Sequence, residues 1–415
     1  MFLIIIDNDP QKEYAENTYT IYLGRIIMSY HIYCAASNTA EELKCKADFV
    51  CDEADARPML QKAIDEADRL GLSCVLFPGI YEINSHSERS ERGAICFYNP
   101  APAELLYKCQ MHYSTLEGVK PPFGFRDGAV ITLGKDFYES LFDEEEFSVF
   151  YSDGNCMFSH GMILKNLGVQ LPANHKPVVV FNGSFSAGLR YEDCFASCVD
   201  LDTYSPATSE GVPVPHPRSV AFRGCHGSNN YTAELKNLAA IGFGVGFDIG
   251  GEHIYCESLS AYHGIYGFAF DCYKGKRSID TPDSERALGV SIYPIVCINL
   301  LDEHNVHMPR FGNASHNGNT RQGWKKSITI LGMNLQWPNT CPGHTDRSAP
   351  DFLDGRHRAV EDQIGSWGGR IEYVIDHSTE GHGMNICDDP FFEDGHGINI
   401  RTVNHHGKDS QRENN

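Results

Sequence analysis

Three aspartates share one local pattern, in which the acid stands between two apolar residues, and a fourth matches it more loosely. They are Asp200 in "CVDLDT", Asp248 in "VGFDIG", Asp271 in "FAFDCY" and, fourth, Asp302 in "NLLDEHN". On successive rungs of a solenoid such positions would lie about 5 Å apart, or about 9–10 Å apart at two rungs. Retaining and inverting glycosidases separate their carboxyl groups by about 5–5.5 and 6.5–9.5 Å. The pattern therefore predicts paired-carboxylate cleavage or transfer of glycosidic bonds, with Asp248 and Asp271 as the core pair.

Further acidic, aromatic and basic side chains surround this pattern. Asp200, Glu252 and Glu257 are the next catalytic candidates, because one carboxylate raises the pKa of a neighbouring one and suits it to act as a general acid. Aromatic faces stack on sugar rings, and imidazoles orient groups or transfer protons. We assign substrate binding to six residues: His253, His263, Tyr262, Tyr266, Arg223 and Trp337. The alternative is structural, since Asp binds backbone amides in turns and aromatic side chains fill solenoid interiors.

A second cluster gathers nine acidic or histidine residues between positions 376 and 396. Oxygen and imidazole ligands of this kind bind divalent cations. No EF-hand loop and no HExxH spacing is present. We therefore assign no metal ligand and no firm cofactor, and leave a divalent cation such as calcium open. The structural alternative for this cluster is a solvated acidic surface.

Short apolar runs separated by Gly, Asn and Ser recur after residue 128 and indicate strands. "LKNL" occurs at 164–167 and again at 235–238, which we interpret as a separation of about three coils of 22–25 residues. "VGFDIG" at 245–250 and "FAFDCY" at 268–273 match at an offset of 23 residues. Such self-similarity is typical of a solenoid, so the sequence predicts an all-β, single-stranded parallel β-helix.

A helical pattern precedes these strands. Residues 55–70 place apolar side chains at intervals of three and four, with Asp55 as the expected N-cap and Gly71 as the expected stop. A short strand, "CVLF", and a Pro78-Gly79 turn follow. The first coil of a solenoid exposes strand edges and an open apolar end, so the helix is expected to act as a cap.

The same segment, "ADFVCDEADARPMLQKAIDEA…GLSCVLFPGIYEINS" (47–85), resembles the N-terminal signature of right-handed β-helix proteins of the pectin-lyase-like superfamily. Asp55-Ala56 departs from the Asp-Asp that the family often has, and Pro78 directly before Gly79 is a second departure. The resemblance implies a right-handed parallel β-helix that acts on carbohydrate, but this superfamily contains several reaction types. The residues that fit are Gln61, Ala63, Ile64, Asp65, Ala67, Pro78, Gly79 and Tyr81.

Composition limits the partners. A net charge of −21 repels phosphate backbones and anionic lipid, so we expect no nucleic-acid or membrane partner and a saccharide substrate instead. The 15 cysteines include no CxxC pair. Several lie in apolar runs, among them Cys74, Cys256 and Cys297, which is typical of buried thiols in a reducing compartment. We therefore expect a cytoplasmic protein.

The expected organisation is one solenoid at 46–340, with its capping helix at 55–70. Residues 1–45 are an N-terminal extension, within which Met28 is an alternative start that would leave 1–27 outside the native chain. Residues 341–406 are expected to hold a polar loop and final β segments, and 407–415 a frayed tail.

These features favour an intracellular glycoside hydrolase or transglycosidase acting on an oligosaccharide or polysaccharide. One alternative is a calcium-dependent polysaccharide lyase, in which Arg190, Arg218 or Arg223 would accept the proton. Another is a non-enzymatic, trimeric fibre or adhesin of the phage type. A homotrimer is compatible with the enzymatic alternatives as well.

Overall fold

The computed structural model is mostly β-structure. It describes residues 31–98, 112–122, 127–152, 160–172, 176–184, 186, 188–205, 210–224, 232–250, 253–270, 295–303, 305, 310–311, 326–336, 367–376 and 398–405. Helices are few and short in this part: α2 (Glu41–Lys44), α3 (Arg57–Leu70) and α4 (Lys135–Ser140). None of them is long and apolar enough to cross a bilayer.

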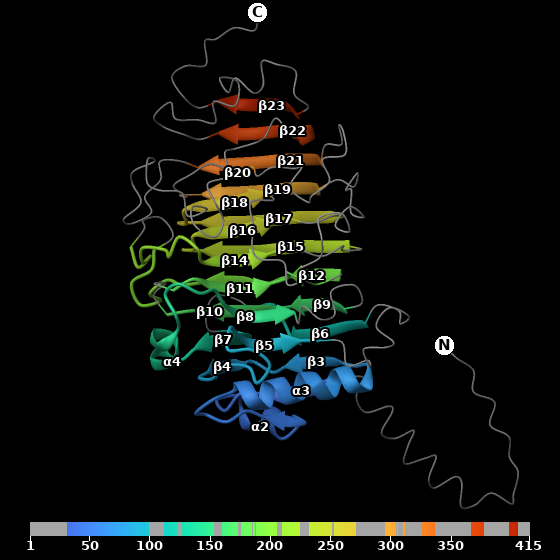
Figure 1. Ribbon diagram of the computed structural model, residues 1–415, viewed down its shortest axis with the longest axis vertical. Helices are drawn as coiled ribbons and strands as arrows, with labels where there is room; N and C mark the ends of the chain where they lie inside the picture. The colour runs from blue at the N-terminus through green and yellow to red at the C-terminus, as the bar shows by residue number, and fades with distance from the viewer. Residues whose placement is uncertain are drawn as a thin grey trace, which may run out of the picture.

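Two parallel sheets run along the long axis of the molecule (Figure 1). The larger one follows the order β2 (Phe49–Val50), β1 (His31–Ala35), β3 (Ser73–Leu76), β6 (His112–Gly118), β9 (His160–Lys165), β12 (Gly188–Glu192), β15 (Thr232–Ile241), β17 (Ile254–Tyr262), β19 (Ile295–Glu303), β21 (Lys326–Gln336), β22 (Trp367–Asp376) and β23 (Ile398–His405). A branch of the same sheet joins it at β15, with the order β4 (Gly79–Ile83), β7 (Ala129–Leu133), β10 (Leu167–Gln170) and β13 (Phe195–Ser197). The larger sheet thus includes residues from the expected N-terminal extension and from the expected C-terminal section.

The smaller sheet follows the order β5 (Gly93–Phe97), β8 (Phe147–Ser152), β11 (Val178–Asn182), β14 (Val220–Arg223), β16 (Val245–Ile249), β18 (Tyr266–Phe270) and β20 (Arg310–Phe311). From β11 to β20 the chain alternates between the two sheets, whereas β21, β22 and β23 all belong to the larger one. Residues far apart in the sequence therefore become neighbours on adjacent strands.

From β9 to β21, each passage of the chain through the larger sheet bends at one residue with positive φ. Asn237 bends β15 (φ 52°), Ser258 bends β17 (56°) and Asn299 bends β19 (56°). The left-handed backbone region favours Asn, Asp and Gly, which explains the polar residue inside each apolar run. We call this set the bend column: Asn166, Asp193, Asn237, Ser258, Asn299 and Gly332. It divides the larger sheet into a leading arm before the bend and a trailing arm after it.

The bend column corrects the expected repeat count. Both "LKNL" segments place their Asn at a bend, so they do occupy equivalent positions. Leu164 pairs with Tyr191, and Tyr191 with Leu235. The two segments are therefore two coils apart and the expectation of three was wrong, because the intervening loops differ in length.

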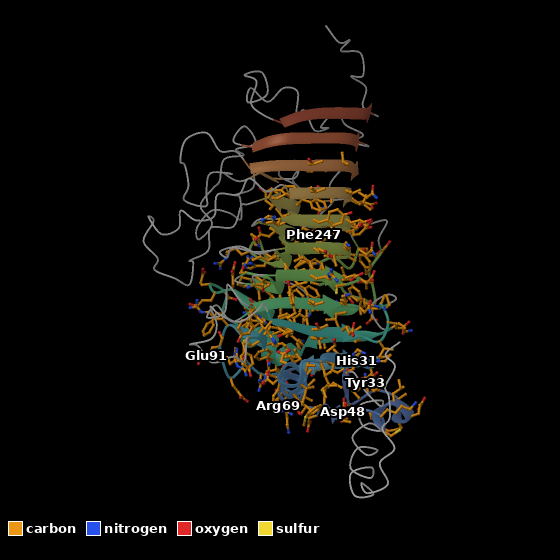
Figure 2. All side chains as sticks on the ribbon, turned by 90° about the vertical axis from the view of Figure 1, so that its right-hand side faces the viewer. His31, Tyr33, Asp48, Arg69, Glu91 and Phe247 are labelled. Carbon is orange, nitrogen blue, oxygen red and sulfur yellow. The ribbon has the colours of Figure 1, made fainter. Side chains whose placement is uncertain are left out.

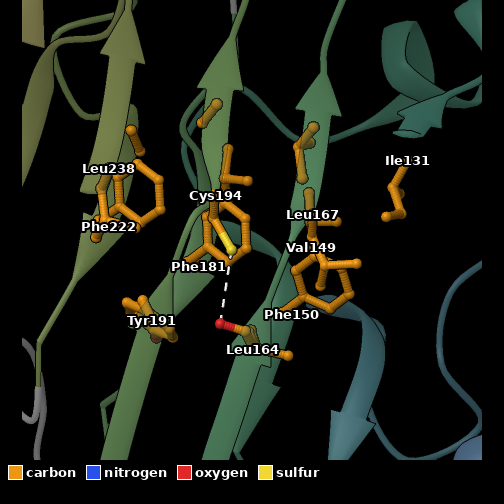
Figure 3. Packing of buried hydrophobic residues seen from close by; sticks show 14 of the residues in the cluster. Ile131, Val149, Phe150, Leu164, Leu167, Phe181, Tyr191, Cys194, Phe222 and Leu238 are labelled. Atoms are coloured by element: carbon orange, nitrogen blue, oxygen red, sulfur yellow. Dashed lines mark hydrogen bonds between the residues drawn. The ribbon is translucent and has the colours of Figure 1, made fainter. Parts of the chain in front are cut away.

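A stack of phenylalanine rings fills the interior (Figure 3). The rings of Phe150, Phe181, Phe222, Phe247 and Phe268 follow one another at centroid distances of 5.4, 4.6, 5.2 and 5.2 Å. This spacing follows from parallel strands about 4.8 Å apart that place identical residues in register. Figure 2 shows Phe247 within the stacked strands. Cys74, Cys256 and Cys297 are fully buried free thiols, as their apolar runs predicted.

Helix α3 covers the first coil. The N-cap is Ala56 rather than the expected Asp55, which lies one residue earlier and whose Oδ1 accepts the Arg57 N–H at 3.0 Å. Gly71 ends the helix with φ 68°, as expected. The side-chain amide of Gln61 pairs with the backbone of Cys96 on the edge strand β5, with both hydrogen bonds at 2.9 Å. Gln61 thereby takes the place of a missing next strand.

Candidate functional site

The matched aspartates do not form one column. Phe247 pairs with Phe268, 21 positions along the chain, so Asp248 aligns with Ala269 rather than with Asp271. The expected stacking of Asp248 on Asp271 at an offset of 23 is therefore wrong, because the phenylalanine stack fixes the register. Asp271 itself lies outside the described residues. Asp302 lies on β19 of the larger sheet, away from the β16 strand that carries Asp248.

Asp248 belongs to a buried ion network instead of a catalytic pair. Its flanking residues Phe247 and Ile249 belong to the interior, so Asp248 faces outward from the smaller sheet. Arg223 Nε donates to Asp248 Oδ2 at 3.0 Å, and the other guanidinium nitrogens donate to both carboxylate oxygens of Glu146 at 3.0 and 3.2 Å. Arg223 is 1% and Asp248 5% exposed. The substrate-binding role of Arg223 is thus corrected to a structural one, and the same network occupies Asp248.

Asp200 supports a turn, which is the structural alternative considered for it. Its carboxylate accepts hydrogen bonds from the Asp202 N–H at 3.0 Å and from Thr203 Oγ1 at 2.9 Å. Its carbonyl accepts the Tyr204 N–H at 2.8 Å. The turn fixes the position of Tyr204, a residue that the sequence did not single out.

Tyr204 lies near the end of the trailing arm, where two further polar side chains are found. Tyr262 ends β17 and Glu303 ends β19, and the two pair in register. Their neighbours Ala261 and Asp302 are buried, so Tyr262 and Glu303 face outward and are partly exposed. We call Tyr204, Tyr262 and Glu303 the outer cluster.

The members of the outer cluster influence one another electrostatically. Burial raises the pKa of Tyr204 to about 12, with further contributions from Tyr262 and from the charge of Glu303. Burial also raises the pKa of Tyr262, and Glu303 adds to the effect. The ring of His263 stands edge-on to Tyr204 with centroids 6.2 Å apart, and the backbone N–H of His263 donates to the Glu303 carbonyl at 3.1 Å. Tyr262 thus lies beside a turn held by Asp200, whereas the ring of His263 is fully buried, so its predicted substrate-binding role is wrong.

Glu257 and His253 are not part of the outer cluster. Glu257 faces outward on the leading arm, where it accepts a hydrogen bond from Tyr255 Oη at 3.0 Å. That arm carries ion pairs between neighbouring strands, such as Lys165 with Glu192 and Arg190 with Glu234, each at 2.9 Å. His253 precedes β17 with φ 54°, and burial lowers its pKa.

Tyr266 is 4% exposed and packs with Val179, Val220 and Val245, so it cannot stack on a sugar and its predicted binding role is wrong. Glu252 and Trp337 lie outside the described residues, as does most of the acidic segment 376–396. Across the described residues, no three His, Cys, Asp or Glu side chains are grouped so that they could hold a metal ion.

No protein-family model matches the chain, and the comparisons found neither a similar curated protein nor a similar solved structure.

Proposed function

We propose that the chain folds as a single-stranded right-handed parallel β-helix of the pectin-lyase-like type. Successive parallel strands with crossovers take the right hand in about 98% of cases. Two residues of the resembling segment support the proposal by their contacts. Gln61 covers the edge of β5, and Tyr81 Oη lies 2.9 and 2.8 Å from the carbonyls of Cys34 and Phe77 in the first coil.

On this fold, we propose a carbohydrate-active enzyme that cleaves or transfers glycosidic bonds at the outer cluster. The observation that carries the proposal is the outward-facing group of two partly exposed tyrosines beside one carboxylate. The rings of Tyr204 and Tyr262 would stack on a sugar, while Glu303 would act as acid, base or nucleophile at the glycosidic bond. Paired-carboxylate chemistry needs a second acid, for which the turn that carries Tyr204 offers the exposed Asp200 and Asp202. Neither role requires a cofactor.

The lyase alternative has less support. Its proton acceptor would be an arginine, and all three candidates are engaged. Arg190 pairs with Glu234 at 2.9 Å, and Arg223 lies in the buried network with Asp248. Arg218 donates to the carbonyls of Asp143 and Glu144 at 2.9 and 3.1 Å. We therefore favour hydrolysis or transfer over elimination.

Matched substitutions on the two arms test the function. We expect a screen of oligosaccharides to find one that the protein binds and turns over. Tyr262→Ala should weaken binding by up to about tenfold, the loss expected from removing one stacking face. Glu303→Gln should remove turnover while binding remains. Tyr255→Ala and Glu257→Gln, the same changes on the leading arm, should leave both unchanged.

Three outcomes would reject the proposal. Equal losses from the leading-arm variants would show that the outer cluster is not the site. Binding without turnover, together with a trimer in light scattering, would favour the fibre or adhesin. An unsaturated product would favour the lyase.

A further inference from the structure

Asp302 places a carboxyl group inside the molecule. It is 1% exposed and pairs in register with Ala261 on β17. Gly267 on β18 approaches it so closely that a Cβ there would lie 2.7 Å from Asp302 Oδ1. Ala261 on β17 and Gly267 on β18 are both small and thus leave room for the Asp302 side chain.

Asn305 joins this carboxyl to the neighbouring coil. Its Nδ2 donates to Asp302 Oδ1 at 2.6 Å and to the Ala261 carbonyl at 2.9 Å. Its Oδ1 accepts the Gly264 N–H at 2.7 Å. One buried amide therefore holds residues 261–264 against Asp302 at the end of β19.

The surroundings disfavour a charge on Asp302. Burial raises its pKa to about 7, against the opposing hydrogen bond from Asn305. Among the described residues, Asp302 Oδ2 has no hydrogen-bond partner. A buried carboxylate with so few donors costs several kcal/mol, whereas the neutral acid costs much less. The ionisable side chains on the described elements packed around it are His263 and Tyr262 at the end of β17, Tyr266 on β18, Glu303 on β19 and Tyr204 on the adjacent turn.

We propose that Asp302 and Asn305 form a pH-sensitive latch between residues 261–264 and the end of β19. With Asp302 neutral, the carboxyl stays inside and Asn305 keeps its bonds to Gly264 and Ala261. Once Asp302 ionises, water can solvate it only if the end of β19 moves outward, and that movement breaks those bonds. Because Tyr262 ends β17 and Glu303 ends β19, the latch sets the spacing of the outer cluster.

Hydrogen–deuterium exchange tests the latch without any saccharide. Mass spectrometry of peptides covering 254–270 gives protection factors once the intrinsic pH dependence of exchange is removed. Between pH 6 and pH 8 we expect protection at 261–265 to fall about tenfold in the wild type, because opening releases the proton more readily as pH rises. Asp302→Asn, which stays neutral, should show no such fall. Asp193→Asn, the same change in the bend column, should behave as the wild type.

Constant protection in the wild type would overturn the proposal, and so would an equal fall in Asp302→Asn. If Asp302→Asn fails to fold, ¹³C NMR of the wild-type aspartate carboxyls decides. A buried carboxyl that titrates near neutral pH together with the loss of protection supports the latch, whereas full ionisation at pH 5 excludes it.

Discussion

Asp248 and Asp302 are both buried aspartates in apolar runs, and the sequence offered both for one acidic column. Asp248 faces outward from the smaller sheet and bonds to Arg223, which also binds Glu146. Asp302 faces inward from the larger sheet and bonds to the neutral amide of Asn305. One buried acid has a guanidinium partner, and the other has only burial and an amide. The two acids are similarly buried, so they differ in the partner that each one bonds: a cation for Asp248 and a neutral amide for Asp302.

The largest effect should come from removing the cation beside Asp248. Arg223→Met leaves two carboxylates facing each other without a cation, so we expect a loss of about 3–5 kcal/mol in the free energy of unfolding, measured with urea. Arg190→Met removes an exposed pair with Glu234 and should cost at most about 1 kcal/mol. Equal losses in the two variants would mean that burial of the ion network contributes nothing.

The pH dependence of stability should come from Asp302. The pKa of Asp302 is about 7 in the folded state, above its value in the unfolded state. At pH values between the two, the folded protein therefore binds one proton more than the unfolded protein. Stability is then fully present below about pH 4 and is lost as pH rises to about 7, with a difference of about 3 kcal/mol between pH 5 and pH 8. Urea unfolding at both pH values measures it, and Asp302→Asn should remove this difference. An increase in stability over this range that depends on Asp302 would contradict the assignment.

Gln61 is a buried polar side chain without charge, and it can be compared with the buried acids Asp248 and Asp302. Gln61→Leu removes the two hydrogen bonds to the Cys96 backbone at the edge of β5, together with the bond to Asp65 Oδ1 at 2.9 Å, and should cost about 2 kcal/mol. Because the backbone groups of Cys96 do not titrate, their part of the cost should be the same at pH 5 and pH 8. A cost that varied with pH would show that this edge is coupled to an ionisable group.

The smallest effect should come from a partly exposed acid, Glu257. Glu257 accepts a hydrogen bond from Tyr255 on the outer face of the leading arm. Glu257→Gln should change the free energy of unfolding by no more than about 0.5 kcal/mol, since exposed charges interact weakly across water. A larger loss would mean that the leading arm depends on its charges as the Arg223 network does.

Local patterns predicted the local elements well. The spacing of apolar residues predicted helix α3, and Gly71 ends it as expected. Register could not be predicted, because it depends on which phenylalanines stack, and a shift of two residues separated Asp248 from Asp271. The outer cluster was predicted only in part. Tyr262 lies in a recognisable strand, whereas Tyr204 is placed by the hydrogen bonds of Asp200, and the short "DLDT" turn before it was the one available signal.

The phenylalanine stack also makes the molecule tolerant of insertions. Phe247 and Phe268 are 21 positions apart, whereas Phe181 and Phe222 are 41 apart, yet both pairs lie on adjacent strands. The stacked rings therefore fix the register of adjacent strands. The connecting loops can change length without changing that register. Foreign peptides grafted into the connection between β13 and β14 should be displayed on the surface of an intact scaffold.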